Sequence, residues 1–176
     1  MNARYVAASR HMNPYTLGTQ AMEFVQADET DRATLFDLHK QALGPYVDQI
    51  FGWDDSEQER IFYQKFDPSA NKWIVVDGIK VGVVKYRDNG DHFYIDNIEI
   101  YPKYQGKGNG STAINSVLSE ANRRYINVDL QVFKINPAVR LYERLGFQKI
   151  GETENHVQMR RVPKSWSPSH SPIQGH

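Results

Sequence analysis

The sequence of 176 residues contains no cysteine, which excludes disulfide bonds, a cysteine nucleophile and thiolate metal sites. It also lacks an excess of charge, because 21 Lys and Arg residues balance 21 Asp and Glu residues. This balance argues against nucleic acid or an anionic membrane surface as a partner. No apolar run approaches the roughly 20 residues that a membrane helix needs. The 6 histidines are scattered without helical metal-ligand spacing, so we expect no metal.

The two ends differ in composition from the middle of the chain. Residues 1–22 contain Arg4 and Arg10 but no acid, and they lack the apolar core of a secretory signal. We expect a disordered extension over residues 1–21, with an organellar transit peptide as the alternative, and a cytoplasmic protein. Residues 163–176, rich in proline and serine, predict a flexible tail. Residues 22–162 then form one domain of ordinary size.

Hydrophobic periodicity and turn residues predict the order βααβββαβαββ. The first strand is expected at residues 22–27, and a helix follows from residue 28 until Gly44-Pro45 ends it. The remaining expected elements are a helix at 54–66, strands at 72–76, 79–87 and 91–102, a helix at 111–124, a strand at 126–133, a helix at 136–147 and a final hairpin. This order predicts an α/β fold of the α+β type with one mixed sheet.

The strand expected at 91–102 changes its pattern at Asp96-Asn97. Its apolar residues are odd-numbered before that point and even-numbered after it, namely Phe93, Ile95, Ile98 and Ile100. Side chains alternate faces along a strand, so the change indicates one extra residue, a β-bulge, near Asp96-Asn97. The alternative is an ordinary bend with both faces partly buried.

The run "YPKYQGKGNGST" (101–112) lies between that strand and the next expected helix. Glycines let backbone N–H groups approach an anion, and helix N-termini attract phosphates, so the run is a candidate pyrophosphate cradle. A flexible loop is the alternative. A Walker loop is excluded because Gly108 follows Gly106-Lys107, and a Rossmann fingerprint is excluded because Ser111 stands where glycine is needed.

Two motifs in this order resemble those of the GNAT superfamily of acetyl-coenzyme A-dependent N-acetyltransferases. Gln105, Gly108 and Gly110 fit its Q/R-x-x-G-x-G/A motif, and "VFKINPAVRLYERLGF" (132–147) is similar to its second signature. The resemblance covers about residues 22–160. It implies a mixed, mostly antiparallel central sheet flanked by helices, with acetyl-CoA as the acyl donor.

The resemblance also implies how the donor binds. The pantetheine arm lies beside the bulged strand, where the backbone of residues 98–100, Ile98 and Ile100 included, pairs with it. The pyrophosphate lies on the backbone of residues 105–111, namely Gln105, Gly106, Lys107, Gly108, Asn109, Gly110 and Ser111. Asn136 either hydrogen-bonds the pantetheine or caps its own helix.

Direct acyl transfer from a thioester to an amine needs a base, an oxyanion donor and an acid. The resemblance places Glu99 as the general base, with Asp96 as the alternative base and a solvated strand residue as the alternative role of Glu99. The Ile100 N–H is the expected oxyanion donor. Tyr142 matches the tyrosine that protonates the departing thiolate, or else it is a core residue.

The acceptor is expected near the first two helices. Residues 44–60 hold 5 acids against Arg60 alone, a net charge of −4, and they also carry aromatic residues. We expect a small cationic amine there, unless the acids merely begin a solvated helix. Candidate contacts are His39, Tyr46, Trp53, Asp54 and Asp96. The competing functions are a non-catalytic acyl-CoA-binding module and the acetylation of protein N-termini or lysines, by a monomer or a homodimer.

Overall fold

The computed structural model describes residues 21–164. The extension expected at 1–21 and the tail expected at 163–176 therefore fall almost wholly outside the described residues. Within the described range, no helix combines the length and the apolar character that crossing a bilayer requires.

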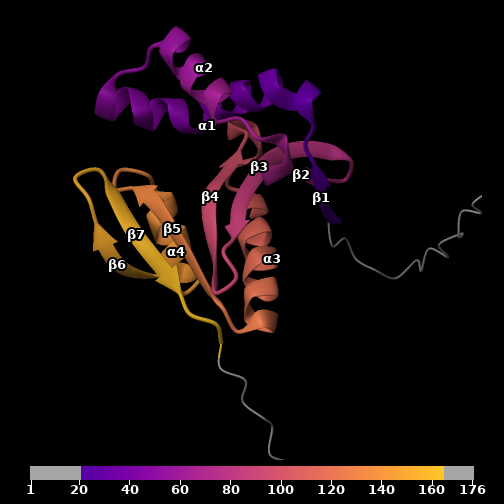
Figure 1. The fold of residues 1–176 in the computed structure, drawn as a ribbon, viewed down its shortest axis with the longest axis vertical. Helices are drawn as coiled ribbons and strands as arrows, with labels where there is room; N and C mark the ends of the chain where they lie inside the picture. The colour runs from indigo at the N-terminus through magenta and orange to yellow at the C-terminus, as the bar shows by residue number, and fades with distance from the viewer. Residues whose placement is uncertain (1–20, 165–176) are drawn as a thin grey trace, which may run out of the picture.

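A seven-stranded sheet forms the centre of the molecule (Figure 1). Its spatial order is β1-β2-β3-β4-β5-β7-β6, and every neighbouring pair is antiparallel except β4 with β5. The mixed, mostly antiparallel sheet expected from the sequence is confirmed. The strands are β1 (Met22–Gln26), β2 (Asn71–Val76), β3 (Ile79–Asp88), β4 (His92–Ile100), β5 (Asn127–Phe133), β6 (Gln148–Glu152) and β7 (His156–Arg161).

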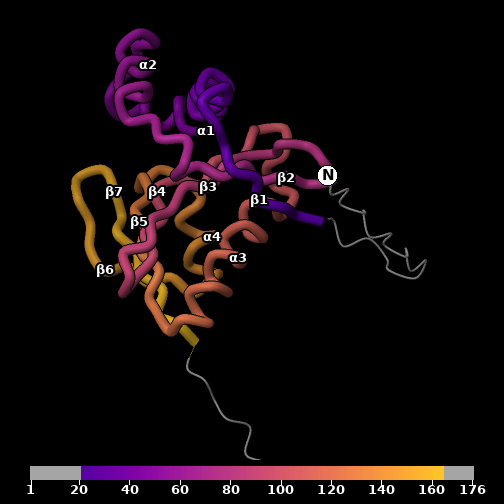
Figure 2. Tube along the Cα trace, turned by 45° about the vertical axis from the view of Figure 1, so that its right-hand side comes forward, coloured from indigo at the N-terminus to yellow at the C-terminus, as the bar shows by residue number. Residues whose placement is uncertain are grey.

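Helices cover both faces of the sheet, as Figure 2 shows. The side chains of β2 alternate between the two faces, as a pleated strand requires. Trp73 and Val75 are buried in a cluster with Leu35 and Leu38 of α1, while Ile74 belongs to the larger cluster that includes α3. The helices are α1 (Arg32–Phe51), α2 (Asp55–Gln64), α3 (Asn109–Arg124) and α4 (Ala138–Arg144).

The expected end of the first helix at Gly44-Pro45 is wrong, because α1 continues to Phe51 with Pro45 inside it. An internal proline costs roughly 3 kcal/mol in an unsupported helix. Packing next to the proline offsets this cost, because Gly44 is buried against the Trp53 ring. The helix ends instead at Gly52, whose positive φ of 78° ends α1 without strain.

The bulge predicted in β4 is confirmed. Lys85 pairs with Asn97 and Tyr86 with Ile95, which leaves Asp96 as the extra residue. The parallel pairing of β4 with β5 reaches only as far as Ile95 opposite Leu130. Beyond that pair the two strands separate toward α1, which is visible as a widening gap between β4 and β5 in Figure 1. This separation exposes the edge of β4 where the site lies.

Candidate active site

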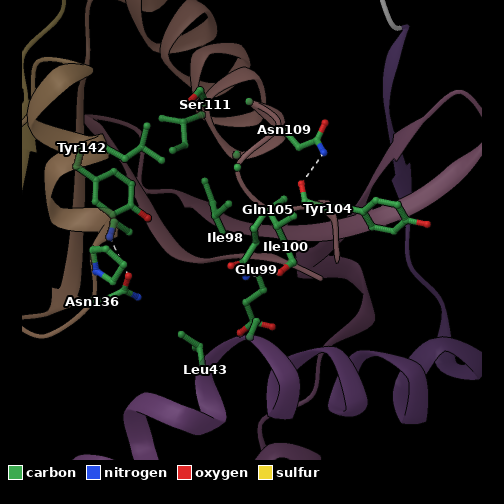
Figure 3. Close-up of a pocket in the computed structure, with 18 of the residues that line it drawn as sticks. Leu43, Ile98, Glu99, Ile100, Tyr104, Gln105, Asn109, Ser111, Asn136 and Tyr142 are labelled. Carbon is green, nitrogen blue, oxygen red and sulfur yellow. Dashed lines mark hydrogen bonds between the residues drawn. The ribbon is translucent and has the colours of Figure 1, made fainter. Parts of the chain in front are cut away.

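Three cavities surround the separated end of β4. The cradle cavity, of about 410 Å³, lies between residues 98–100, the glycine run 104–111, the start of α4 and residues 42–46 of α1 (Figure 3). The bulge cavity, of about 220 Å³, lies between α1, β4 and β5. The α2 cavity, of about 250 Å³, lies between α2 and residues 71, 85 and 97 of the sheet.

The glycine run has the backbone geometry of an anion cradle. Gly106 and Gly108 have φ values of 71° and 82°, a region that residues with a Cβ rarely adopt, and α3 begins directly after them at Asn109. The first helical N–H groups of α3 point out of the helix without intrahelical partners. Lys107 and Lys103 flank the ring of Tyr104 at 5.6 and 5.0 Å from its centroid, and so add positive charge.

The side chains of Gln105 and Asn109 fasten the cradle rather than face a ligand. Gln105 Nε2 donates to the carbonyl of Ile100 at 2.8 Å. Asn109 is buried, and its Nδ2 donates to the carbonyl of Tyr104 at 2.9 Å. The start of α3 is thereby held at a fixed position against the end of β4.

The edge of β4 presents its backbone to the cradle cavity. Tyr101 N donates to the carbonyl of Val81 at 3.0 Å across the β3 side. Backbone hydrogen bonds alternate sides along an antiparallel strand, so Ile98 and Ile100 direct their N–H groups away from β3, toward the gap. Both residues line the cradle cavity.

Glu99 is buried at 3% exposure, so its reading as a solvated strand residue is wrong. Its Oε1 atom is 2.8 Å from His39 Nδ1 of α1 and accepts a hydrogen bond from Asn97 Nδ2, also at 2.8 Å. Asp96, the alternative base, lines the bulge cavity, but its carboxylate pairs with the Arg87 guanidinium through contacts of 2.9 to 3.1 Å. The partners of Glu99 are a histidine and an amide, and neither carries a permanent charge. Asp96, in contrast, is paired with the permanently charged guanidinium of Arg87.

Tyr142 lines both the cradle cavity and the bulge cavity. Figure 3 shows it on the far side of the cavity from Gln105 and Tyr104. Burial raises the pKa of Tyr142 to about 12, which keeps its hydroxyl protonated near neutral pH. Asn136 Oδ1 accepts a hydrogen bond at 2.9 Å from the N–H of Ala138, the first residue of α4.

The acids of residues 44–60 have local partners. Asp48 accepts from Trp53 N at 3.0 Å and Asp54 from Glu57 N at 2.8 Å, so both cap chain segments. Asp55 lies 2.6 Å from Lys40 Nζ, and none of these three acids lines the three cavities. Trp53 and Asp54 also lie outside the cavity linings. His39 and Tyr46 do line cavities, so only some of the acceptor contacts expected from the sequence lie at a cavity.

Sequence reasoning missed the contacts of His39 and the position of Arg144. His39 and Glu99 are 60 residues apart, and no local pattern signals their pairing. The contact between Asn97 and Glu99 could have been predicted from the sequence, because residues i and i+2 share one face of a strand. Arg144, from the last turn of α4, lines the cradle cavity and adds a third cation near the glycine run. Within residues 21–164, no group of three or more His, Asp and Glu side chains could hold a metal.

The family comparison agrees with this geometry. The profile of the Acetyltransferase (GNAT) family matches residues 32–147, well over half of the 176 residues. The chain therefore belongs to the GNAT family of acetyltransferases. No curated protein matches the chain in sequence.

Solved structures share the fold at low sequence identity. PaiA N-acetyltransferase from Thermoplasma acidophilum, in complex with coenzyme A, has a TM-score of 0.67 and 14% identity, covering 81% of this chain and 99% of its own. The Escherichia coli ribosomal-protein-S18-alanine N-acetyltransferase has a TM-score of 0.61 and 19% identity, and the match covers 85% of this chain and 99% of that enzyme. Histone acetyltransferase HPA2 and related acetyltransferase from Corynebacterium glutamicum has a TM-score of 0.61 and 18% identity. The match covers 84% of this chain and 99% of that protein.

Proposed function

We propose that the protein transfers an acetyl group from acetyl-CoA directly to the primary amine of a small acceptor. The observation that carries this proposal is the continuity of the β4 edge with the N-terminus of α3 in one cavity of about 410 Å³. That continuity suits a donor with an amide-rich arm and a pyrophosphate. The cradle fits such a group, because the space beside Gly106 and Gly108, where a Cβ would lie, is open. The coenzyme A complex of PaiA supports the same donor.

The residues around this cavity supply the groups that acyl transfer requires. Glu99, directly or through water, takes a proton from the acceptor ammonium, and the amine nitrogen then bonds to the thioester carbonyl carbon. The Ile100 N–H stabilises the oxyanion as the carbon–sulfur bond breaks. Tyr142 protonates the departing thiolate and regains a proton as the nitrogen becomes an amide. Coenzyme A contributes the activated thioester.

The sizes of the bulge and α2 cavities favour a small acceptor over a polypeptide chain. The cationic character expected from residues 44–60 has less support, because the acids that suggested it serve as caps and ion-pair partners. A polypeptide acceptor is the second candidate, since the E. coli structural neighbour acts on a ribosomal protein.

The test is release of coenzyme A thiol from acetyl-CoA with a panel of amines, amino acids, polyamines and peptides. We expect turnover with a small amine and a large loss of turnover in Glu99→Gln, at unchanged coenzyme A binding. Turnover with peptides alone would favour acetylation of proteins. Coenzyme A binding without turnover of any amine would favour a non-catalytic binding module and contradict the proposal.

A further inference from the structure

His39 and Glu99 form a buried pair between α1 and β4. The His39 Nδ1 to Glu99 Oε1 distance is 2.8 Å, and the side chains are 20% and 3% exposed, respectively. The ring is also enclosed by Phe62, with centroids 5.4 Å apart, and by Trp53, at 6.4 Å. A histidine that is so constrained by neighbours has one defined orientation.

The pair defines which nitrogen of His39 carries the proton. An ionised carboxylate can only accept hydrogen bonds, so Nδ1 must be the donor toward Glu99. In the neutral ring, Nε2 then carries the lone pair and can take a proton. Asn97 Nδ2 donates to the same Oε1 atom and fixes the carboxylate in place.

The position of His39 is better suited to meet the acceptor than that of Glu99. His39 lines both the bulge cavity, which also contains Tyr142, and the α2 cavity. Glu99 lines only the cradle cavity among the three. We propose, on the basis of the acetyl-transfer function above, that His39 rather than Glu99 is the catalytic residue that takes the ammonium proton, and that Glu99 is the positioning residue that holds its Nδ1–H.

The proton balance of this step is complete. Nε2 of His39 accepts one proton from the acceptor ammonium, and the resulting imidazolium keeps its Nδ1–H on Glu99. The neutral amine forms the bond to the acetyl carbon, and the imidazolium later releases its proton to solvent. The other charged or titratable groups that line the two cavities with His39 are Lys65 directly after α2, Lys85 of β3, Asp96 of β4, Tyr142 of α4 and His156 of β7.

The first arm of the test needs no acceptor. Nitrogen-15 NMR of the whole protein should show that the neutral His39 ring carries its proton on Nδ1, and Glu99→Gln should change that signal. Any other tautomer of His39 in the wild-type protein would overturn the proposal.

The second arm compares His39→Ala with the wild type across pH, using phenethylamine and L-lysine as acceptors. The variant should lose about 10²- to 10⁴-fold in turnover near pH 7. The deficit should shrink strongly above about pH 10, where such amines are already deprotonated and need no base. A deficit that is the same at every pH would indicate a purely structural role and overturn the proposal.

His92→Gln is the matched control, because His92 Nδ1 pairs with Asp91 at 2.7 Å but lines none of the three cavities. It should keep wild-type turnover. Absence of wild-type turnover with every amine of the panel would instead refute the proposed function, and the NMR arm would still decide whether the pair has the required tautomer.

The charge of the α2 cavity carries a second inference, about the acceptor. Lys65 and Lys85 line this cavity, no acid does, and neither lysine makes an ion pair within 4.0 Å among residues 21–164. Asp67 lies close enough to Lys85 to feel its charge: the pKa of Asp67 is lowered mainly by the Ser69 side-chain hydrogen bond and additionally by Lys85. Amide side chains of Gln58, Asn71 and Asn97 complete the polar lining.

We infer that the acceptor carries a carboxylate, which Lys65 and Lys85 bind while its amine lies next to His39 in the same α2 cavity. This inference also rests on the proposed function. The test uses paired acceptors that differ by one carboxylate: L-phenylalanine against phenethylamine, and L-lysine against cadaverine.

In each pair the carboxylated acceptor should have the higher kcat/KM. This preference should fall about tenfold in the double variant Lys65→Gln and Lys85→Gln, because the two substitutions remove two charge-assisted contacts. The variant should leave the KM for acetyl-CoA unchanged. A wild-type preference for phenethylamine and cadaverine, or a preference that the double variant leaves intact, would overturn the inference. Absence of turnover with all four acceptors would count against it as well.

Discussion

Replacement of Tyr142 by phenylalanine removes a single hydroxyl group and keeps the ring, which packs edge-on against Phe147 with centroids 5.6 Å apart. Burial raises the pKa of Tyr142 from 10.0 to about 12. This difference of about 2 in pKa corresponds to roughly 3 kcal/mol in favour of the protonated phenol. The hydroxyl is therefore a proton donor throughout the pH range in which an acetyltransferase is assayed.

The kinetic result follows from losing that donor. Tyr142→Phe should lower kcat by about 10²- to 10⁴-fold, because the thiolate must leave unprotonated. The KM for acetyl-CoA should change little. Tyr94→Phe is the matched control: burial also raises the pKa of Tyr94, but the residue lines none of the three cavities. Wild-type turnover by Tyr142→Phe at every pH would show that another group protonates the thiolate.

The stability result has a definite sign. The folded-state pKa of Tyr142 lies above the unfolded value, so its contribution is fully present below about pH 10 and is lost as the pH rises through about 12. Over that window the wild type should lose up to about 3 kcal/mol more unfolding free energy than Tyr142→Phe. Urea unfolding at several alkaline pH values measures this difference. Parallel losses in the two proteins would refute the burial argument.

Three further changes test other parts of the site. Gly108→Ala forces a residue with a Cβ to adopt a φ of 82°, which should lower the unfolding free energy by about 1–2 kcal/mol. Calorimetry should also show weaker coenzyme A binding by this variant. Gly52→Ala, at a φ of 78° outside the cavities, should lower stability alone. Gly82→Ala would place its Cβ 2.3 Å from the Glu99 carbonyl oxygen, so urea unfolding should show a loss of about 1–3 kcal/mol or more, and thiol release should fall. Asp96→Asn should keep most thiol-release activity while Glu99→Gln loses it, and the reverse result would make Asp96 the base.

Local patterns in the sequence were sufficient for the donor side of the site. The parity change at Asp96 is a property of consecutive residues, so the bulge and its position follow from strand alternation alone. The need for glycine at positions 106 and 108 is equally local, because it arises from the φ angles of those residues. The resemblance of two motifs then placed both features on one fold.

The acceptor side depends on contacts between distant segments, which periodicity does not encode. Pro45 predicted a helix end, yet α1 continues past it, with Gly44 buried against Trp53. The acids at 48, 54 and 55 suggested a binding surface, yet they serve as caps and ion-pair partners within the same segment. The pairing of α1 with β4 through His39 and Glu99 is visible only in three dimensions.

Amide hydrogen exchange with and without coenzyme A is the most direct test of the central claim, that the β4 edge and the start of α3 form one donor site. The account predicts that coenzyme A slows exchange at residues 98–100 and at residues 105–111 together. Binding that protects neither segment, or the absence of binding, would contradict it.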